Sequence, residues 1–316
     1  MGYSLCILGC GTMGVAVSAG VLASLQSQSP LRSLNSASKW ESHTPGTSTP
    51  VNRPELDPTL PSRFLICVRR DESARKLTQT FAEFSDVGPA IDILIGENLT
   101  GVAEADVVLL CCKPQQAQSI LSEPGIVDAL KGKLLISILA GVTISQLSAW
   151  VHPDTKVIRA MPNTPCKIRE GMTVVSTLPD NRSADLDRSI ILKIFSSIGR
   201  CRFLEEKHFD ACTAVSGSGP AFACIFLEAI ADGGVMMGLP RAEALELAAQ
   251  TLQGTARMAL QSNAHPAQIK DAVTTPGGCT IAGLLALEDG KVRSTIARAI
   301  QVATERASEL GQQSKK

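Results

Sequence analysis

Aromatic side chains are scarce in this chain, where they make up 3% of 316 residues. Charge of either sign is not in excess, because 30 Lys and Arg balance 30 Asp and Glu. Proteins that bind nucleic acid need a basic surface, and those that bind single strands also stack bases on aromatic rings. We therefore expect no nucleic-acid partner and no attraction to an acidic membrane surface.

Metal-binding and export patterns are also missing. The ten cysteines include no CxxC pair, and no Cys/His cluster has zinc spacing, so we predict no metal site. We interpret the cysteines as reduced, small apolar residues of a cytoplasmic protein. The apolar start has no Lys or Arg before Arg32 and is interrupted by glycines, which disfavours a signal peptide or a membrane span.

What the first part of the chain does contain is an alternation of strand-like and helical patterns. The apolar runs are "YSLCILG", "RFLICVRR", "ADVVLLCCK", "KLLISILA", "KVIRAMP" and "GMTVVST". Helical patterns lie between them, around residues 71–84 and 114–130. This alternation predicts an α/β, Rossmann-like domain over residues 1–205 with a mainly parallel sheet. Residues 27–62, rich in Ser, Thr and Pro, are interpreted as a flexible insertion.

The pattern changes after residue 205. Residues 206–316 hold long helical periods with breaks at Gly and Pro and no convincing strand, so we predict an all-α second domain. Its many apolar faces favour packing against a second copy of the chain, with a buried intrachain face as the alternative.

A glycine-rich loop follows the first strand. It fits G-x-G-x-x-G and opens a helix, which is the arrangement that holds a dinucleotide pyrophosphate on helix N–H groups. The first glycine allows the tight turn, the second lets the backbone approach the phosphates, and the third packs helix on strand. The predicted pyrophosphate-binding residues are Gly9, Cys10, Gly11, Thr12, Met13 and Gly14.

The end of the second strand indicates which nicotinamide cofactor binds. That strand ends at Arg69 and Arg70, and removing the insertion restores the expected spacing of about 20 residues from the loop. Arginines suit the 2′-phosphate of NADPH better than a ribose hydroxyl. Asp71 follows directly, so use of NADH stays open.

A second glycine-containing turn lies far along the chain, in "DAVTTPGGCTIAG". Gly277, Gly278 and Cys279 precede a helix predicted from Thr280, so their N–H groups can face an anion. Thr274 and Thr275 add hydroxyl donors. This stretch predicts a second anion cradle.

Several motifs together resemble the pyrroline-5-carboxylate reductase family. They are "LLCCKPQ", "ISILAGVTI", "RAMPNTP", "AVSGSGPAFACIFLEAIADGGVMMGLPR", "HPAQIKDAVTTPGGCTIAG" and "ALEDGKVRSTIARAI". The resemblance spans the whole chain except the insertion. It implies an oxidoreductase that reduces 1-pyrroline-5-carboxylate to L-proline in the last step of proline biosynthesis. It also implies a helical domain that interlocks with a partner chain in homodimers, which often assemble into decamers.

The resemblance also implies residue roles. Arg69 lies where the family contacts the adenosine ribose and its phosphate, and Thr280 lies near the substrate ring nitrogen as the candidate catalytic residue. The cradle Thr274, Thr275, Gly277, Gly278, Cys279 and Thr280 matches the substrate site. The further cofactor positions are Asn98, Cys111, Cys112, Lys113, Pro114, Leu139, Ala140, Gly141 and Asn163. Hydride transfer is then expected between the pyrophosphate loop and the second cradle.

The chemistry implied by the resemblance needs few charged groups. An imine protonated before binding is already electrophilic, so no strong general acid is required, and no histidine has a catalytic setting. Lys270 and Asp271 are interpreted as an ion pair that braces the cradle rather than as a catalytic pair.

Two rival functions are weaker. The β-hydroxyacid dehydrogenase family resembles this chain in its domain plan. That family, however, needs a lysine on the helix after the domain junction and an asparagine one turn later. Ala221–Gly234 contains neither. A nucleotide sensor without turnover would need the first cradle and not the second.

Overall fold

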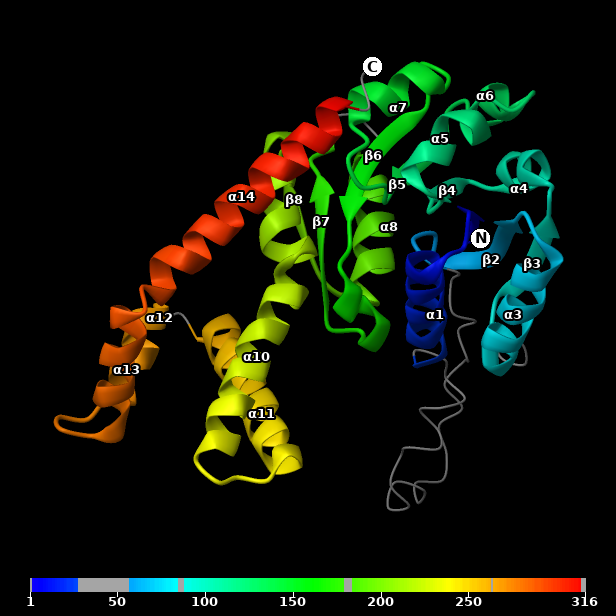
Figure 1. Ribbon diagram of the computed structural model, residues 1–316. Coiled ribbons are helices and arrows are strands. Elements are labelled where there is room, and N and C mark those ends of the chain that lie inside the picture. Colours follow the sequence, from blue (N-terminus) through cyan, green and yellow to red (C-terminus); the bar gives the residue numbers. More distant parts are fainter. Residues whose placement is uncertain (1, 28–56, 85–87, 179–183, 263, 314–316) are drawn as a thin grey trace, which may run out of the picture. The chain divides into compact units, whose positions relative to one another are not determined.

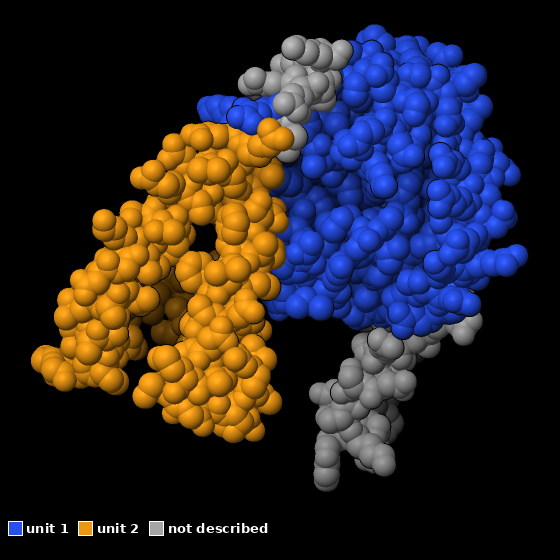
Figure 2. Space-filling view, viewed as in Figure 1, with its two compact units in different colours: residues 1–212, 307–316 blue, residues 213–306 orange. Residues whose placement is uncertain are grey.

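The computed structural model describes residues 2–27, 57–84, 88–178, 184–262 and 264–313 (Figure 1). The chain divides into two compact units (Figure 2). Unit 1 runs to Cys212 and includes the end of the chain from Ala307, whereas unit 2 is Thr213–Arg306. The division lies a few residues beyond the predicted boundary after residue 205.

The predicted flexible insertion, 27–62, falls mainly on residues 28–56, which lie outside the described residues. At its margins the structure is regular, because Ser27 ends a helix and Pro61 begins a strand.

Unit 1 is built on an eight-stranded sheet in the order β3-β2-β1-β4-β5-β6-β7-β8. Neighbouring strands are parallel except β6 and β7, which are antiparallel. The predicted Rossmann-like domain with a mainly parallel sheet is therefore confirmed. The strands are β1 (Tyr3–Leu8), β2 (Pro61–Val68), β3 (Ala90–Ile95), β4 (Val107–Leu110), β5 (Leu134–Ser137), β6 (Lys156–Met161), β7 (Gly171–Ser176) and β8 (Gly199–Leu204).

Two strands, β3 and β8, were not predicted. Both lie at the edges of the sheet, and their sequences "AIDILI" and "GRCRFL" carry charged residues within the run. An edge strand is less buried than a central one, so it lacks the continuous apolar run that marks β1 or β4.

Helices cover both faces of this sheet (Figure 1). One apolar core lies under α1 (Thr12–Ser27), α3 (Asp71–Phe81) and α8 (Ala184–Ser196). The other lies under α4 (Asn98–Glu104), α5 (Pro114–Leu121), α6 (Ile126–Ala129) and α7 (Ile144–Trp150). Buried on both faces, the central strands β1, β4 and β5 are mostly apolar. The helical pattern predicted over 114–130 forms two helices, α5 and α6.

Short helical turns complete unit 1. They are η1 (Ala82–Phe84), η2 (Thr164–Ile168), η3 (Glu206–His208) and α9 (Phe209–Cys212).

Unit 2 is entirely helical in the part of the chain that the structure describes, as predicted. Its elements are η4 (Thr213–Gly217), α10 (Gly219–Met236), α11 (Arg241–Gln261), α12 (Pro266–Ala272), α13 (Cys279–Asp289) and α14 (Val292–Gln313), the last of which continues past Arg306. Its buried apolar cluster consists of Ala231, Ala244 and Ala248. Large side chains such as Ile225, Met236 and Leu285 are exposed by 60% or more.

Among the described residues, the run Glu206–Met236 is long and apolar enough to cross a membrane by length and composition alone. Only 11% of its most apolar window is buried within the chain. A helix whose apolar face is covered by another protein chain has the same length and composition.

Candidate functional site

The residues predicted to bind the cofactor follow six neighbouring strands, β3, β2, β1, β4, β5 and β6, at their carboxyl ends. Hydrogen bonds tie these ends together. The Gly9 N–H donates to the Cys67 carbonyl (3.1 Å), and the Cys111 N–H donates to the Leu8 carbonyl (2.9 Å). The strand order reverses between β1 and β4, the switch point at which such folds bind ligands. The fold therefore gathers the predicted cofactor positions along one edge of the sheet.

The loop after β1 has the conformation that its glycines predict. Gly9 adopts a φ of +81°, and an added Cβ would lie 2.8 Å from the Cys112 Cα, so the loops after β1 and β4 touch at this point. A side chain is excluded there on both grounds. By contrast, a Cβ on Gly11 would meet no heavy atom within 4 Å, which leaves open space against the backbone where α1 begins at Thr12. That space lies where a pyrophosphate would approach.

Three cysteines surround this loop, and burial keeps them protonated. Burial raises the pKa of Cys10 to about 12 and that of Cys112 to about 11, and it raises the pKa of Cys111 well above its usual range. A thiol with such a pKa is a poor nucleophile near neutral pH. The interpretation of Cys111 and Cys112 as small apolar residues agrees with these shifts.

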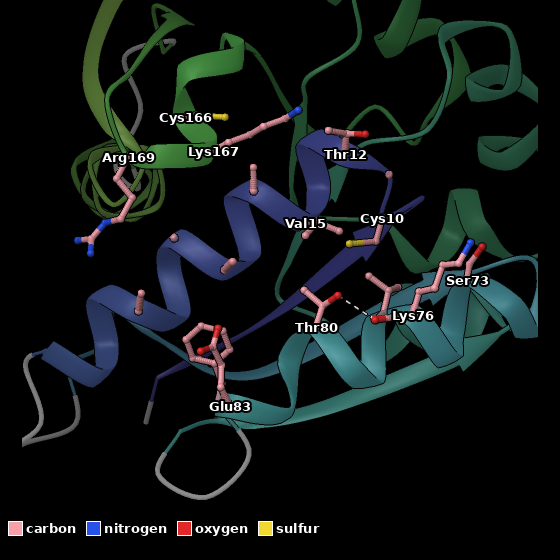
Figure 3. A pocket seen from close by; sticks show the side chains of 17 residues that line it. Cys10, Thr12, Val15, Ser73, Lys76, Thr80, Glu83, Cys166, Lys167 and Arg169 are labelled. Carbon is pink, nitrogen blue, oxygen red and sulfur yellow. Dashed lines mark hydrogen bonds between the residues drawn. The ribbon is translucent and has the colours of Figure 1, made fainter. Parts of the chain in front are cut away.

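A cavity of about 620 Å³ begins at the same loop (Figure 3). Cys10, Gly11 and Thr12 line one end, and the cavity continues along α1 beside α3 and η2, where Lys76 and Arg169 also line it. The other predicted cofactor residues do not line it. The cavity thus shares the pyrophosphate loop but leads away from the carboxyl ends of the strands.

The charged and polar cofactor candidates lie at the starts of helices. Arg69 and Arg70 are exposed directly before α3, and Lys113 and Pro114 open α5. Asn98 opens α4, and its Nδ2 donates to both carboxylate oxygens of Glu123 (3.0 and 3.1 Å).

Asn163 precedes η2, and its Oδ1 accepts from the Met172 N–H (2.8 Å). Glu123 lies outside the predicted motifs and Met172 was predicted only as part of a strand, so these bonds to Asn98 and Asn163 were not predicted. Both amides thus hold local structure besides any contact with a cofactor.

The loop after β5 has two buried ends and an exposed tip. Leu139 and Val142 are buried, whereas Ala140 is exposed and a Cβ added to the partly exposed Gly141 would meet no heavy atom within 4 Å. Thr143 then caps α7 in a reciprocal pair with Gln146. The exposed tip is the part that can meet a ligand.

The predicted substrate cradle lies between α12 and α13. Gly277 adopts a φ of +68°, and α13 begins at Cys279, one residue before its predicted start. The first-turn N–H groups, those of Cys279, Thr280 and Ile281, have no partner within the helix. They are the anion-facing donors that the sequence predicts.

Two of the predicted cradle donors are already used within unit 2. The Thr274 hydroxyl donates to the Lys270 carbonyl (2.8 Å), and the Gly278 N–H donates to the Thr275 carbonyl (3.1 Å). Lys270 and Asp271 form the expected ion pair (3.0 Å). Thr274 and Gly278 therefore shape the turn, which leaves Thr275, Gly277, Cys279 and Thr280 as the groups available to a ligand.

A buried charge near the loop after β5 was not predicted from the sequence. Arg159, on β6, is 6% exposed, and its guanidinium lies 3.1 Å from the Glu206 carboxylate and 4.8 Å from the centre of the Phe209 ring. The arginine inside the apolar run "KVIRAMP" is the signal that could have indicated it, because a buried cation needs an acid partner. Within the described ranges, no group of three or more His, Cys, Asp or Glu residues could hold a metal ion.

Comparisons with known proteins bear on both units. Residues 206–310 match the family model for pyrroline-5-carboxylate reductase dimerisation, and residues 55–141 match the model for NADP oxidoreductase, coenzyme F420-dependent. The chain is 46% identical to a pyrroline-5-carboxylate reductase of Lophium arboricola, over 98% of this chain and 93% of the relative. It is 44% identical to one from Schizosaccharomyces pombe, over 97% of this chain and 98% of the relative.

Solved structures of pyrroline carboxylate reductases also align with nearly the whole chain. The Plasmodium falciparum pyrroline carboxylate reductase, with NADP bound, aligns with a TM-score of 0.72 at 26% identity, over 98% of each chain. A pyrroline-5-carboxylate reductase from Coxiella burnetii aligns with a TM-score of 0.77 at 26% identity, also over 98% of each chain.

Proposed function

The chain belongs to the pyrroline-5-carboxylate reductase family, and on that premise we propose that it reduces 1-pyrroline-5-carboxylate to L-proline with NADPH, the last step of proline biosynthesis. The observation that supports this most is 46% identity to a relative of that name across nearly the full length of both chains. Both candidate cradles lie inside the aligned length.

The residues of unit 1 fit a dinucleotide. The tight turn at Gly9 and the open space at Gly11 leave backbone N–H groups at the start of α1 for a pyrophosphate. Arg69 and Arg70, exposed at the end of β2, offer two cations for a 2′-phosphate. The tip at Ala140 and Gly141, with Asn163 at the end of β6, is proposed to lie beside the nicotinamide. When bound, NADPH supplies the hydride.

The residues of unit 2 fit the acid group of the substrate. We place the carboxylate on the N–H groups of Cys279 and Thr280, with Thr275 and Gly277 alongside. Binding the carboxylate there orients the ring, and orientation supplies much of the rate in a reaction between bound partners. The Thr280 hydroxyl is proposed to orient the ring nitrogen or relay its proton. An imine that binds already protonated needs no stronger acid.

The exposed apolar side chains of unit 2 support a homodimer. The segment matched by the dimerisation family model, 206–310, includes Ile225, Met236 and Leu285, each of which is at least 60% exposed in the single chain. A second copy that covers them would remove a large apolar area from water. We propose homodimers, with decamers as a higher assembly, and a cytoplasmic location.

Light scattering on the purified protein tests the assembly. A mass of two chains or a multiple of two supports it. A stable monomer that floats with lipid vesicles would instead assign the apolar helix run to a membrane. Cell fractionation tests the cytoplasmic location, which recovery in a membrane or organelle fraction would contradict.

The function is tested by mixing purified protein with the cyclic imine and with NADPH or NADH in separate reactions. We expect imine-dependent loss of the reduced-cofactor absorbance and formation of L-proline, faster with NADPH. No loss at high protein concentration with either cofactor would refute the proposal.

A further inference from the structure

Glu206 connects a buried strand residue of unit 1 to the partly buried start of a helix. Its Oε1 accepts a hydrogen bond from the Ile144 N–H (2.9 Å) and another from the Arg159 guanidinium (3.1 Å). Ile144 is the first residue of α7, and Arg159 lies in the middle of β6. One carboxylate oxygen thus joins a helix start to a strand across 62 and 47 residues of chain.

The buried arginine makes this contact costly to lose. The Arg159 side chain is 7% exposed, and its guanidinium lies over the fully buried ring of Phe209. The backbone of Arg159 is fixed as well, because its N–H donates to the buried Ser176 hydroxyl (3.0 Å). Removal of the acid would leave a desolvated cation without its countercharge, so the guanidinium would have to move or draw in water.

The same oxygen also holds the far end of the loop after β5, where Val142 is buried and Thr143 pairs with Gln146. At the near end, the Ile138 N–H donates to the Leu110 carbonyl (3.1 Å), which continues the sheet. At the far end, the chain is held where the Ile144 N–H meets Glu206. Between these two points lie the exposed Ala140 and the partly exposed Gly141, where an added Cβ would meet no heavy atom within 4 Å. The position of the tip therefore depends on both anchors.

We propose that Glu206 is a positioning residue that holds the Ala140–Gly141 tip in place for the nicotinamide end of the cofactor, through Ile144 and Arg159. The inference rests on the proposed function, because that function puts the nicotinamide beside this tip. Glu206 itself contacts neither the substrate nor the pyrophosphate loop in this account. Its loss should therefore affect one end of the cofactor and spare the other.

Binding measurements with two ligands distinguish the nicotinamide end of the cofactor from its adenosine end. Calorimetric titration with NADP⁺ reports on the whole cofactor, and titration with 2′,5′-ADP reports on the adenosine end alone. For Glu206→Ala we expect the Kd for NADP⁺ to rise about five- to tenfold while the Kd for 2′,5′-ADP stays within about twofold of wild type. Glu206→Gln keeps an acceptor for the Ile144 N–H, so it should recover part of the loss.

A neighbouring glutamate supplies the matched control. Glu205 is exposed and paired with Lys207 (2.6 Å), so Glu205→Ala should bind both ligands as wild type does. In turnover, Glu206→Ala should lower kcat about tenfold with less than a twofold change in the KM for the imine, because a displaced tip misaligns a bound cofactor.

Several outcomes would overturn the inference. Unchanged binding of NADP⁺ by Glu206→Ala would do so, and so would an equal loss for NADP⁺ and 2′,5′-ADP, which would indicate general destabilisation. If Glu206→Ala does not fold, Glu206→Gln decides: a weaker Kd for NADP⁺ alone supports the role, and wild-type binding overturns it. Wild-type protein that binds neither ligand would refute the proposed function, and the inference with it.

Discussion

The two units differ in how they bury apolar surface. Unit 1 closes two apolar cores on the two faces of one sheet, with many side chains fully buried. Unit 2 has a buried apolar cluster of only three alanines and leaves most of the exposed large hydrophobic side chains of the described chain on its surface. A helical bundle with so small a core cannot offset the conformational entropy of ordering its residues. Unit 1 can therefore be stable within one chain, whereas unit 2 needs a further surface to pack against.

The difference also divides the proposed chemistry. The proposed cofactor cradle lies on unit 1, at the carboxyl ends of the strands of its sheet. The proposed substrate cradle lies on unit 2, whose exposed apolar side chains we propose a second copy covers. We therefore expect cofactor binding to resist dilution of the protein, and substrate turnover to depend on assembly.

The largest expected effect concerns the core of unit 1. Phe195, on α8, is fully buried, so Phe195→Ala should lower the free energy of unfolding by about 3–5 kcal/mol through lost burial and a cavity. Leu186 on the same helix is 45% exposed, and Leu186→Ala should cost less than about 1 kcal/mol. Chemical denaturation followed by circular dichroism measures both. Equal losses would contradict the position of this core.

The second-largest effect is expected at the exposed apolar face of unit 2. Ile225, on α10, is 64% exposed, and Ile225→Asp should weaken self-association by about 2–3 kcal/mol if a second copy covers it. Sedimentation equilibrium measures the change. Leu186→Asp, the same kind of change at an exposed site in unit 1, should leave association unaltered. An Ile225→Asp protein that assembles like wild type would remove this face from the interface.

The substrate cradle should respond separately from the cofactor cradle. Thr280→Ala should lower kcat about 10- to 100-fold, because the hydroxyl no longer orients the ring nitrogen, while the Kd for NADPH stays within about twofold. Steady-state kinetics and fluorescence titration check the two quantities. Thr255→Ala on α11 serves as the control, since that hydroxyl donates to the Thr251 carbonyl of its own helix. An equal loss of NADPH affinity would contradict the assignment of Thr280 to the substrate cradle.

The cofactor cradle should set the choice between the two nicotinamide cofactors. Arg69→Asp is expected to lower the NADPH-to-NADH ratio of kcat/KM about tenfold or more, since an acid repels a 2′-phosphate and accepts a ribose hydroxyl. Arg75→Asp, exposed on α3, is the comparison variant and should shift the ratio little. An unchanged ratio for Arg69→Asp would take this residue out of the cofactor site.

The smallest effect is expected from surface charge on unit 1. The Lys193 ammonium, with the Thr59 hydroxyl and N–H, lowers the pKa of Asp57 from 3.8 to about 2. The folded pKa is depressed, so the pair stabilises above the ordinary pKa and loses its contribution as pH falls toward 2. Both side chains are about 40% exposed, so Lys193→Met should cost less than about 1 kcal/mol near neutral pH. The melting temperatures of wild type and Lys193→Met should differ at neutral pH and become equal in acid. A difference that persists in acid would contradict this assignment.

Much of unit 1 could be predicted from the sequence because its signals are local. The continuous apolar runs of β1 and β4, and the glycines between β1 and α1, have one simple structural explanation each. The edge strands β3 and β8 could not be predicted in this way, because their alternation with charged residues also fits a loop. Pairing with a neighbouring strand decides between the two, and a single sequence does not display it.

The candidate sites show the same limit. The cradle at Gly277 and Cys279 was predictable as a turn before a helix. The hydrogen bond from the Thr274 hydroxyl to the Lys270 carbonyl was not predictable. A threonine in a turn can bond the local backbone or a ligand, and the sequence alone does not distinguish the two. The contact between Glu206 and Ile144 joins residues 62 positions apart, and only the folded sheet brings them together.

The central claim is that hydride passes from bound NADPH to the imine carbon of 1-pyrroline-5-carboxylate. It is tested most directly with NADPH that carries deuterium at both nicotinamide C4 positions, followed by mass spectrometry of the product. The account predicts L-proline with one deuterium on the carbon of the former C=N bond. Unlabelled proline, or no proline formed, would contradict it.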